Sequence, residues 1–361
     1  MDTFAFIIHP IDPKRDIQRK YPLLGRIATD WMIDHIAPLF PPVYLSEVEG
    51  VISQSTGKEI KGWLIACPLT TQHFYRLPVA QVYRKIIETG WLAERLNAKI
   101  LGLGAYTSVV GDGGVTVAQE LDIPVTTGDA YTIAVAVEAI REAARLLEIP
   151  IQCATGAVVG ATGAIGKVCA ELLCQEVENL ILISRHDKPL GELKDHLQSS
   201  FPKTTIFASN TMEDLQKAQL VLTVTSAAGA VVEPHHLRSG SVVCDVARPR
   251  DVAVQVATVR PDVLVIDGGM VEVPGPVDFH FNFGFPPGKA YACMAETMAL
   301  ALEGRFEDYT LGKNIQVSKV KEIQAISSRH GFRLSGFRSF ERPVTEAQVA
   351  MVRRHAGTGP G

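Results

Sequence analysis

Three glycines at a single strand-to-helix turn constrain the fold of this chain more than any other feature. An apolar run ending at Val159 predicts a strand, and a helical pattern begins near Lys167. Between them, Gly160 permits a tight turn, Gly163 lets an anion approach the backbone, and Gly166 lets helix and strand pack closely. The N–H groups at the start of the helix favour a phosphate. The sequence therefore predicts a dinucleotide-binding turn. We expect three further residues of the turn at the nucleotide, namely Thr162, Ala164 and Ile165.

The next apolar run indicates which nicotinamide nucleotide this turn takes. Leu180–Ile183 has the spacing of the second strand of a βαβ unit, and Ser184 and Arg185 follow it. No acidic residue stands there to bind a ribose 2′-hydroxyl, whereas Ser184 and Arg185 suit a 2′-phosphate. We therefore expect NADPH as the cofactor. The alternative is that Arg185 is only a solvated charge in a loop. Thr225 and Ser226, at the end of a later strand, are expected to line the same crevice.

Alternating strand and helix patterns predict an α/β protein with several segments. Residues 1–149 read as an N-terminal α/β substrate-binding domain, which ends before Pro150. Residues 150–272 read as a Rossmann-like domain with a doubly wound parallel sheet. A C-terminal helical segment, 273–331, follows a Pro- and Gly-rich stretch, and 332–361 reads as a flexible tail.

Composition excludes several classes of protein. The formal net charge of −4 gives no electrostatic reason to expect nucleic acid. The chain has no apolar run long enough for a transmembrane helix, although peripheral membrane contact stays open. Its first residues read as a strand rather than an export signal, so we expect a cytoplasmic protein. The six cysteines have no Cys-x-x-Cys pairing and no His/Asp/Glu cluster has ligand spacing, so we expect free thiols and no metal.

Cys293 differs from the other cysteines in its context. It follows a proline-glycine loop and falls in the first turns of a helix that is expected to start near Lys289. A helix N-terminus and a nearby ammonium both lower the pKa of a thiol, so we expect Cys293 to be a nucleophile with Lys289 beside it. The alternative is a packing cysteine on an Ala- and Met-rich helix face.

A nucleophilic cysteine beside a nicotinamide suggests capture of an acyl group as a thioester, followed by hydride delivery that releases an aldehyde. This chemistry needs hydrogen-bond donors near the acyl oxygen. The candidate substrate-binding residues are Thr107, Ser108, Thr126, Thr127 and Gly128. Helix capping is the alternative role for these hydroxyls. His9 and His280 are candidate proton donors, although the aromatic, apolar run around His280 favours a hydrogen-bonded core or pocket-wall role for it.

Several motifs in one order resemble the long-chain acyl-[acyl-carrier-protein] reductases of the cyanobacterial type, which form fatty aldehydes. The resemblance spans about residues 3–325. It is carried by Leu103–Val109, Thr126–Gly128, Gly160–Gly166, Asp267–Gly269, Ala292–Glu296, Leu302–Gly304 and Gly312–Ser318. It implies that Cys293 carries the acyl group, that the glycine turn binds NADPH, and that the donor is acyl-carrier protein or acyl-CoA. An aldehyde-consuming enzyme is an expected partner. The stretches Cys67–Tyr75 and Pro274–Phe285 depart from the family pattern.

A second resemblance is local. Val243–Asp251 resembles the Asp-x-Ala-x-Pro-Arg-Asp segment of glutamyl-tRNA reductases, which also reduce a cysteine-bound acyl group. Three alternatives therefore stay open beside the fatty acyl reductase. They are a reductase of the glutamyl-tRNA type, a dehydrogenase of a small alcohol or keto acid, and a non-catalytic NADP-binding sensor.

Overall fold

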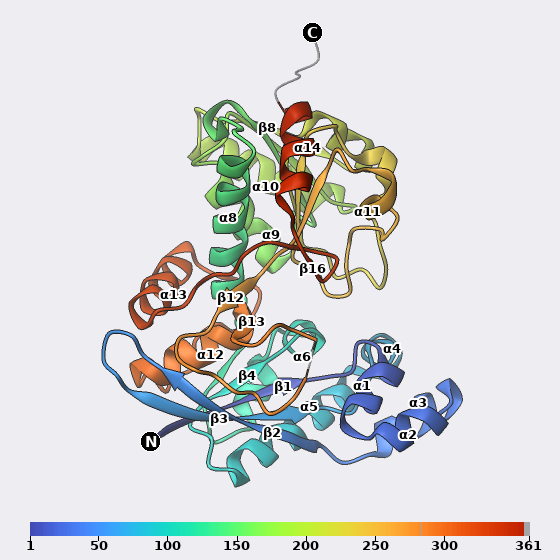
Figure 1. Ribbon diagram of the computed structural model, residues 1–361, viewed down its shortest axis with the longest axis vertical. Helices are drawn as coiled ribbons and strands as arrows, with labels where there is room; N and C mark the ends of the chain where they lie inside the picture. Colours follow the sequence, from blue (N-terminus) through green and yellow to red (C-terminus); the bar gives the residue numbers. More distant parts are fainter. Residues whose placement is uncertain (283, 357–361) are drawn as a thin grey trace. The chain divides into compact units, whose positions relative to one another are not determined.

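The computed structural model describes residues 1–282 and 284–356, which form two compact units (Figure 1). The first unit combines Met1–Tyr131 with Val271–Arg333, and the second combines Thr132–Met270 with the chain from Leu334 onward. The segment that carries Cys293 is therefore part of the same unit as the N-terminal residues. In the part of the chain that the structure describes, no helix has the length and apolar character to cross a membrane.

The first unit is built on a five-stranded sheet of order β2-β3-β1-β4-β5, in which only the β2–β3 pair is antiparallel. Its strands are β1 (Asp2–Ile8), β2 (Val43–Ile52), β3 (Glu59–Ala66), β4 (Leu101–Leu103) and β5 (Val125–Thr126). Its helices are α1 (Pro13–Lys20), α2 (Pro22–Ile27), α3 (Asp30–Ile36), η1 (Ala37–Leu39), α4 (Thr71–Arg76), α5 (Val79–Arg95), α6 (Tyr106–Val109), α7 (Val115–Gln119), α12 (Ala292–Glu303) and α13 (Val317–His330).

Alternation of side chains along β1 places helices on both faces of this sheet. Ala5 and Ile7 join the buried cluster that includes Val82 of α5. Phe6 points the other way, because an ideal Cβ built on Gly102 of β4 would lie 2.4 Å from its ring and 2.1 Å from Thr297 Oγ1 of α12. Gly102 thus lets α12 approach the sheet closely, and this contact fixes the helix that begins beside Cys293.

The second unit contains a parallel sheet of order β11-β10-β9-β6-β7-β8. Its strands are β6 (Thr155–Val159), β7 (Asn179–Ile183), β8 (Thr205–Ser209), β9 (Leu220–Thr223), β10 (Val242–Asp245) and β11 (Leu264–Asp267). Its helices are α8 (Asp129–Leu146, which begins in the first unit), η2 (Ile151–Cys153), α9 (Ala164–Leu173), α10 (Asp187–Ser200), η3 (Met212–Lys217), η4 (Pro234–His236), α11 (Val256–Val259) and α14 (Glu346–Ala356). The order reverses direction between β6 and β9, so the predicted doubly wound sheet is confirmed, with its switch point between these two strands.

Two expectations about the C-terminal part differ from the structure. Lys289 belongs to the short strand β13 (Lys289–Tyr291), because Tyr291 keeps an extended backbone and the helix begins at Ala292. In the predicted flexible tail, α14 is helical and buries Val349 and Val352. These two apolar side chains are three positions apart and therefore share one helix face, which explains why this part of the tail packs as a helix. The last residues of the predicted tail, 357–361, lie outside the described residues. The remaining short strands are β12 (Met270–Glu272), β14 (Arg333–Leu334), β15 (Arg338–Ser339) and β16 (Arg342–Pro343).

Candidate functional site

Cys293 is the second residue of α12 and keeps a partly exposed side chain in an otherwise buried stretch of helix. The turn between β5 and α8 packs directly against it. Gly128 has a φ of +76°, and an ideal Cβ there would lie 2.3 Å from Cys293 Cα and 2.4 Å from its Cβ. Only glycine leaves room for this approach and adopts this backbone without strain. The structure therefore brings Thr126, Thr127 and Gly128 to Cys293, although some 165 residues separate them in sequence.

A buried carboxylate on the same face of α12 holds this turn in place. Glu296 is 0% exposed, and its Oε1 accepts hydrogen bonds from Thr126 Oγ1 at 2.5 Å and Thr310 Oγ1 at 2.8 Å. Its Oε2 accepts from the Tyr131 N–H at 2.8 Å. Burial raises the pKa of Glu296, and these hydrogen bonds oppose the rise. Because Glu296 lies one helical turn after Cys293, it fixes the turn from Thr126 to Tyr131 relative to the cysteine.

The electrostatics at Cys293 are opposite to those predicted. Burial raises the pKa of the thiol to about 12, and the charges of Asp129 and Glu296 raise it further. The helix N-terminus opposes this rise only weakly. Lys289, which was expected to lower the thiol pKa, instead pairs with Glu272 at 3.8 Å. In this state of the protein, Cys293 is therefore a thiol at neutral pH.

Asp129, the first residue of α8, is a titratable group that the sequence analysis did not single out. Burial and the neighbouring Glu296 charge raise the pKa of its carboxyl to about 7. The Thr127 hydroxyl lies close enough to lower that pKa, although it makes no hydrogen bond of ordinary geometry. Asp129 is thus partly ionised at neutral pH, at the position where its charge acts on the Cys293 sulfur.

Replacing Asp129 by asparagine tests this coupling. Because the pKa of Asp129 is raised from 3.8 to about 7, its folded form resists ionisation, and the wild type loses stability as pH rises from about 4 to 7. The Asp129→Asn variant lacks this loss, so we expect it to exceed the wild type by about 2–4 kcal/mol at pH 8 and to match it near pH 4. Urea unfolding at both pH values measures the difference.

The same substitution should also lower the pKa of Cys293 by removing a neighbouring negative charge. We expect iodoacetamide to alkylate Cys293 several-fold faster at pH 8 in Asp129→Asn. Asp122→Asn, at an exposed acidic position, is the control. Equal alkylation rates in all three proteins would show that Asp129 does not act on the thiol.

The other predicted substrate residues use their hydroxyls locally. In α6, Thr107 Oγ1 donates to Gly104 O at 2.8 Å, and Ser108 Oγ donates to Ala105 O at 2.7 Å. Both are therefore engaged in the turn that starts the helix. His9 also belongs to this turn, since its Nε2 accepts from the Tyr106 N–H at 3.2 Å and burial lowers its pKa to about 4. His9 is neutral and structural at neutral pH.

The predicted nucleotide turn has the expected geometry. Gly160 has a φ of +81°, and an ideal Cβ at Gly166 would lie 2.2 Å from Gly160 O, so both positions require glycine. Gly163 is exposed and directly precedes α9, whose first N–H groups have no acceptor within the helix. A pyrophosphate fits such a helix end. Ala164 and Ile165 form the first turn of α9.

Residues at the ends of neighbouring strands lie beside this turn. Thr162 Oγ1 and Ser184 Oγ share a hydrogen bond of 2.7 Å, which ties the glycine turn to the end of β7. Arg185 follows and is exposed. Thr225 is held by Asp251, which accepts its N–H at 2.7 Å, and Ser226 continues the same loop. The structure thus gathers all the predicted nucleotide residues at the carboxyl ends of β6, β7 and β9.

The segment resembling glutamyl-tRNA reductases is a loop built on two buried aspartates. Asp245 accepts the N–H groups of Ala247 at 3.1 Å and Val252 at 3.1 Å, and burial raises the pKa of Asp245 to about 6. Asp251 Oδ2 also accepts a hydrogen bond from Thr223 Oγ1 at 2.6 Å. These contacts shape the loop that follows β10.

One cluster has ligand atoms close together although no metal was expected. Atoms of Glu213, His235 and His236 lie within 4.8 Å of one another. His236 Nδ1 already accepts the Glu233 N–H at 2.9 Å, and Glu213 accepts the Thr211 hydroxyl. Sequence spacing missed this group because Glu213 comes from a different element.

Comparison with known proteins agrees with this organisation. The model of the family described as shikimate / quinate 5-dehydrogenase matches residues 141–267. The aminotransferase PigE of Serratia sp. is 29% identical over 98% of this chain and 42% of its own length, so the chain spans less than half of that relative. L-tryptophan dehydrogenase of Nostoc punctiforme is similar in structure, with a TM-score of 0.43 and 12% identity over 98% of this chain and 87% of that chain.

The long-chain acyl-[acyl-carrier-protein] reductase of Synechococcus elongatus is 30% identical over 81% of this chain and 87% of its own length. That match covers most of both proteins, and the nucleotide domain matches a dehydrogenase family. The protein is an oxidoreductase with an NAD(P)-binding domain, and as a distant homologue it belongs to the family of the Synechococcus long-chain acyl-[acyl-carrier-protein] reductase.

Proposed function

We propose that this protein reduces a long-chain fatty acyl thioester to a fatty aldehyde with NADPH, through an acyl group bound covalently to Cys293. The observation that carries this proposal is the position of Cys293 at the start of α12, partly exposed and enclosed by the turn from Thr126 to Asp129. Membership of the acyl reductase family supports the same reaction type.

The proposed reaction has two steps, acylation of Cys293 and reduction of the bound acyl group. In the first step the Cys293 sulfur forms a bond to the acyl carbon, the carbon–sulfur bond of the donor breaks, and the proton of the thiol leaves with the donor thiol. NADPH, when bound, supplies the hydride that converts the acyl carbon to an aldehyde. The carbon–sulfur bond to Cys293 then breaks, and the sulfur regains a proton from water.

The high pKa of Cys293 makes proton removal part of the first step. The Asp129 carboxylate would take the thiol proton and then pass it to the departing donor thiolate. This transfer moves one negative charge from oxygen to sulfur, so two negative charges never stand side by side. Asp129, with a pKa of about 7, is partly ionised at neutral pH and suits this role. The buried Thr127 hydroxyl in the same turn is a donor that suits the acyl oxygen.

Arg185 supports the choice of NADPH. It is exposed directly after β7, where a ribose would lie in a sheet of this topology, and Ser184 beside it offers a hydroxyl. A guanidinium at this position favours the 2′-phosphate of NADPH.

The acyl donor and the user of the product follow from the same reaction. Acyl-carrier protein or acyl-CoA would supply the thioester. The relative named as an aminotransferase is more than twice as long as the part that this chain matches. Because aldehydes are amino acceptors in transamination, an aldehyde-consuming enzyme of this class is a fitting partner for this chain.

Intact-protein mass spectrometry tests the covalent step. The wild type and Cys293→Ser are mixed with a long-chain acyl-CoA or acyl-carrier protein in the absence of nicotinamide nucleotide. We expect an adduct of acyl mass on the wild type alone. Adding NADPH should discharge it as aldehyde, faster than the same concentration of NADH.

A second candidate function is favoured by one observation, the match of residues 141–267 to the shikimate / quinate dehydrogenase model. A dehydrogenase of a small alcohol or keto acid would use the same nucleotide domain and leave Cys293 in a packing role. If neither protein forms an adduct with any donor, and Cys293→Ser leaves NADP-linked oxidation of a small alcohol unchanged, this second function replaces the first.

A further inference from the structure

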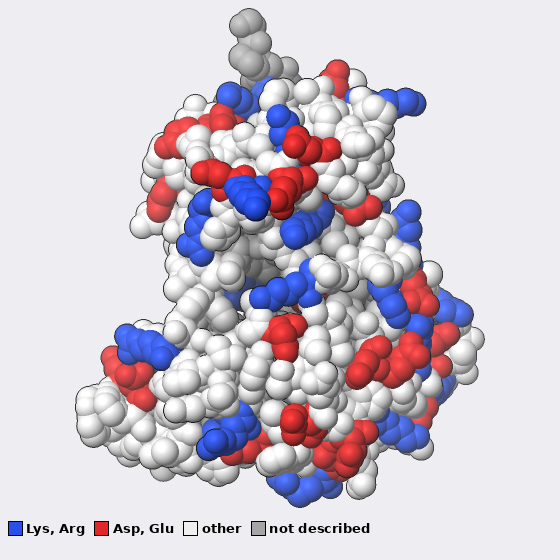
Figure 2. All heavy atoms as spheres, turned by 180° about the vertical axis from the view of Figure 1, so that it is seen from behind, with Lys and Arg blue, Asp and Glu red and all other residues white. Residues whose placement is uncertain are grey.

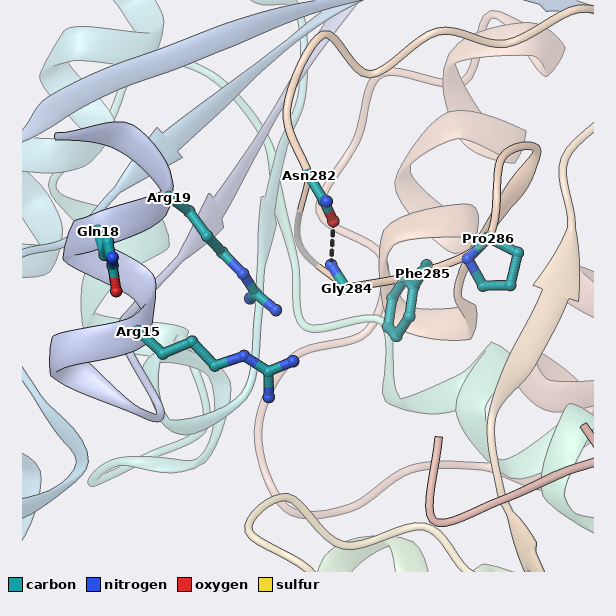
Figure 3. A pocket seen from close by; sticks show the side chains of 7 residues that line it. All are labelled: Arg15, Gln18, Arg19, Asn282, Gly284, Phe285 and Pro286. Carbon is teal, nitrogen blue, oxygen red and sulfur yellow. Dashed lines mark hydrogen bonds between the residues drawn. The ribbon is translucent and has the colours of Figure 1, made fainter. Parts of the chain in front are cut away.

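An open pocket of about 520 Å³ in the first unit lies between helix α1 and the loop that leads to Cys293 (Figure 3). The residues lining it are Arg15, Gln18, Arg19, Asn282, Gly284, Phe285 and Pro286. Arg15 and Arg19 are four residues apart on α1, and Figure 3 shows both guanidinium groups directed toward the loop. The pocket thus has two positive groups on one side and an apolar ring on the other.

Arg19 contacts both sides of the pocket. Its Nη1 donates to Asp16 Oδ1 at 2.9 Å, and Asp16 in turn accepts the N–H groups of Ile11 and Asp12, both at 3.0 Å. On the other side, an ideal Cβ at Gly284 would lie 2.8 Å from Arg19 Nη2, and Gly284 has a φ of +93°. A side chain at this glycine would meet the guanidinium, so the loop and Arg19 lie in close contact.

The loop also connects the pocket to the proposed nucleophile. The ring of Phe285 packs edge-on against Tyr291 with centroids 4.4 Å apart, and Tyr291 directly precedes the helix that carries Cys293. An anion bound by the two arginines would therefore lie on the side of α12 where the helix begins. A long arm could join such an anion to a group at Cys293.

We propose that this pocket binds the phosphate of the 4′-phosphopantetheine arm that presents the acyl thioester, an inference that rests on the proposed function. Acyl-CoA and acyl-carrier protein share this arm, which carries its thioester at one end and its phosphate at the other. Arginine pairs match phosphate oxygens through charge-assisted hydrogen bonds. Phe285 and Pro286 supply an apolar wall for the two methyl groups that adjoin this phosphate in the arm.

Other surfaces of the protein fit this role less well. Acidic and basic side chains are interspersed over the face shown in Figure 2. Among the basic residues near α4 and α5, Lys85 pairs with Glu88 at 2.7 Å and Arg76 with Asp34 at 3.4 Å, as Arg19 does with Asp16, so ion pairing alone does not separate the two places. Arg76 is exposed and Lys85 is largely buried, whereas Arg15 and Arg19 line one pocket together.

Calorimetric titration of the full chain with 4′-phosphopantetheine, pantetheine and inorganic phosphate tests the site without relying on activity. We expect 4′-phosphopantetheine to bind most tightly, and Arg15→Gln combined with Arg19→Gln to weaken it by about tenfold or more. Arg15→Gln alone, which leaves the Arg19–Asp16 pair intact, should show part of this loss. Lys14→Gln is the matched control, because Lys14 lies on the same helix but pairs with Asp30 at 3.1 Å.

Steady-state kinetics then separate the sources of the phosphate. The double variant should raise the KM for acyl-CoA and for acyl-carrier protein alike, and leave turnover of the acyl N-acetylcysteamine thioester, which has no phosphate, unchanged. A rise for only one donor, an equal effect on the phosphate-free donor, or tight binding of inorganic phosphate alone would overturn the proposal. If no donor yielded aldehyde, the proposed function would be wrong. The calorimetric titration would still decide whether the pocket binds 4′-phosphopantetheine.

Discussion

Replacing Gly128 by alanine should destabilise the protein by about 3–5 kcal/mol and displace Cys293. Two effects add at this position. A residue with a side chain resists a φ of +76°, and the new methyl group would lie within 2.4 Å of the Cys293 backbone and Cβ. Neither atom is the end of a flexible side chain, so the turn and α12 must move apart.

Gly57 offers a matched control for the first of these effects. Its φ is +67°, it lies in the turn between β2 and β3, and an ideal Cβ there would meet nothing within 4 Å. Gly57→Ala should therefore cost only the backbone strain, about 1–2 kcal/mol. Urea unfolding of both variants measures the difference. Equal losses would mean that the contact between Gly128 and Cys293 does not constrain the protein.

The nucleotide-binding part was largely predictable from sequence because its signals are local. The strand before Gly160, the helix after Gly166 and the second strand at Leu180–Ile183 lie within a single βαβ unit. Apolar runs at regular spacing indicate buried parallel strands without knowledge of distant contacts. The residues expected at the nucleotide therefore lie at adjoining strand ends in the structure.

The surroundings of Cys293 could not be predicted from local signals of this kind. The prediction that its pKa is low used only neighbours in sequence, and it is wrong because burial and two carboxylates from the fold dominate. Lys289 pairs with Glu272 because it belongs to a strand, and two further strand residues separate it from the helix. One signal was present: Glu296 is an acidic residue within an apolar stretch of helix, and such a residue requires hydrogen-bonding partners when buried.

The pocket at Arg15 and Arg19 depends on a similar long-range contact. The pattern of α1 predicts only a basic, exposed helix, and the loop at Gly284 follows some 265 residues later. Charge along one helix does not indicate which side chains share a pocket with a distant loop.

Replacing Glu296 by leucine should destabilise the protein by about 3–5 kcal/mol. Leucine leaves the hydroxyls of Thr126 and Thr310 and the N–H of Tyr131 buried without an acceptor. Each such group costs about 1–3 kcal/mol, and removal of a buried charge offsets part of the sum. The change should also free the turn at Gly128, so that a covalent acyl adduct on Cys293 forms more slowly than in the wild type.

Glu296→Gln separates hydrogen bonding from side-chain volume. The amide oxygen can still accept from both threonines, but the amide nitrogen would face the Tyr131 N–H, where two donors cannot pair. We therefore expect a smaller loss of about 1–2 kcal/mol, and almost none for Glu120→Gln at an exposed position. Urea unfolding ranks the three variants. If Glu296→Leu were as stable as the wild type, the carboxylate would not hold the turn, and the enclosure of Cys293 would have to come from the contact at Gly128 alone.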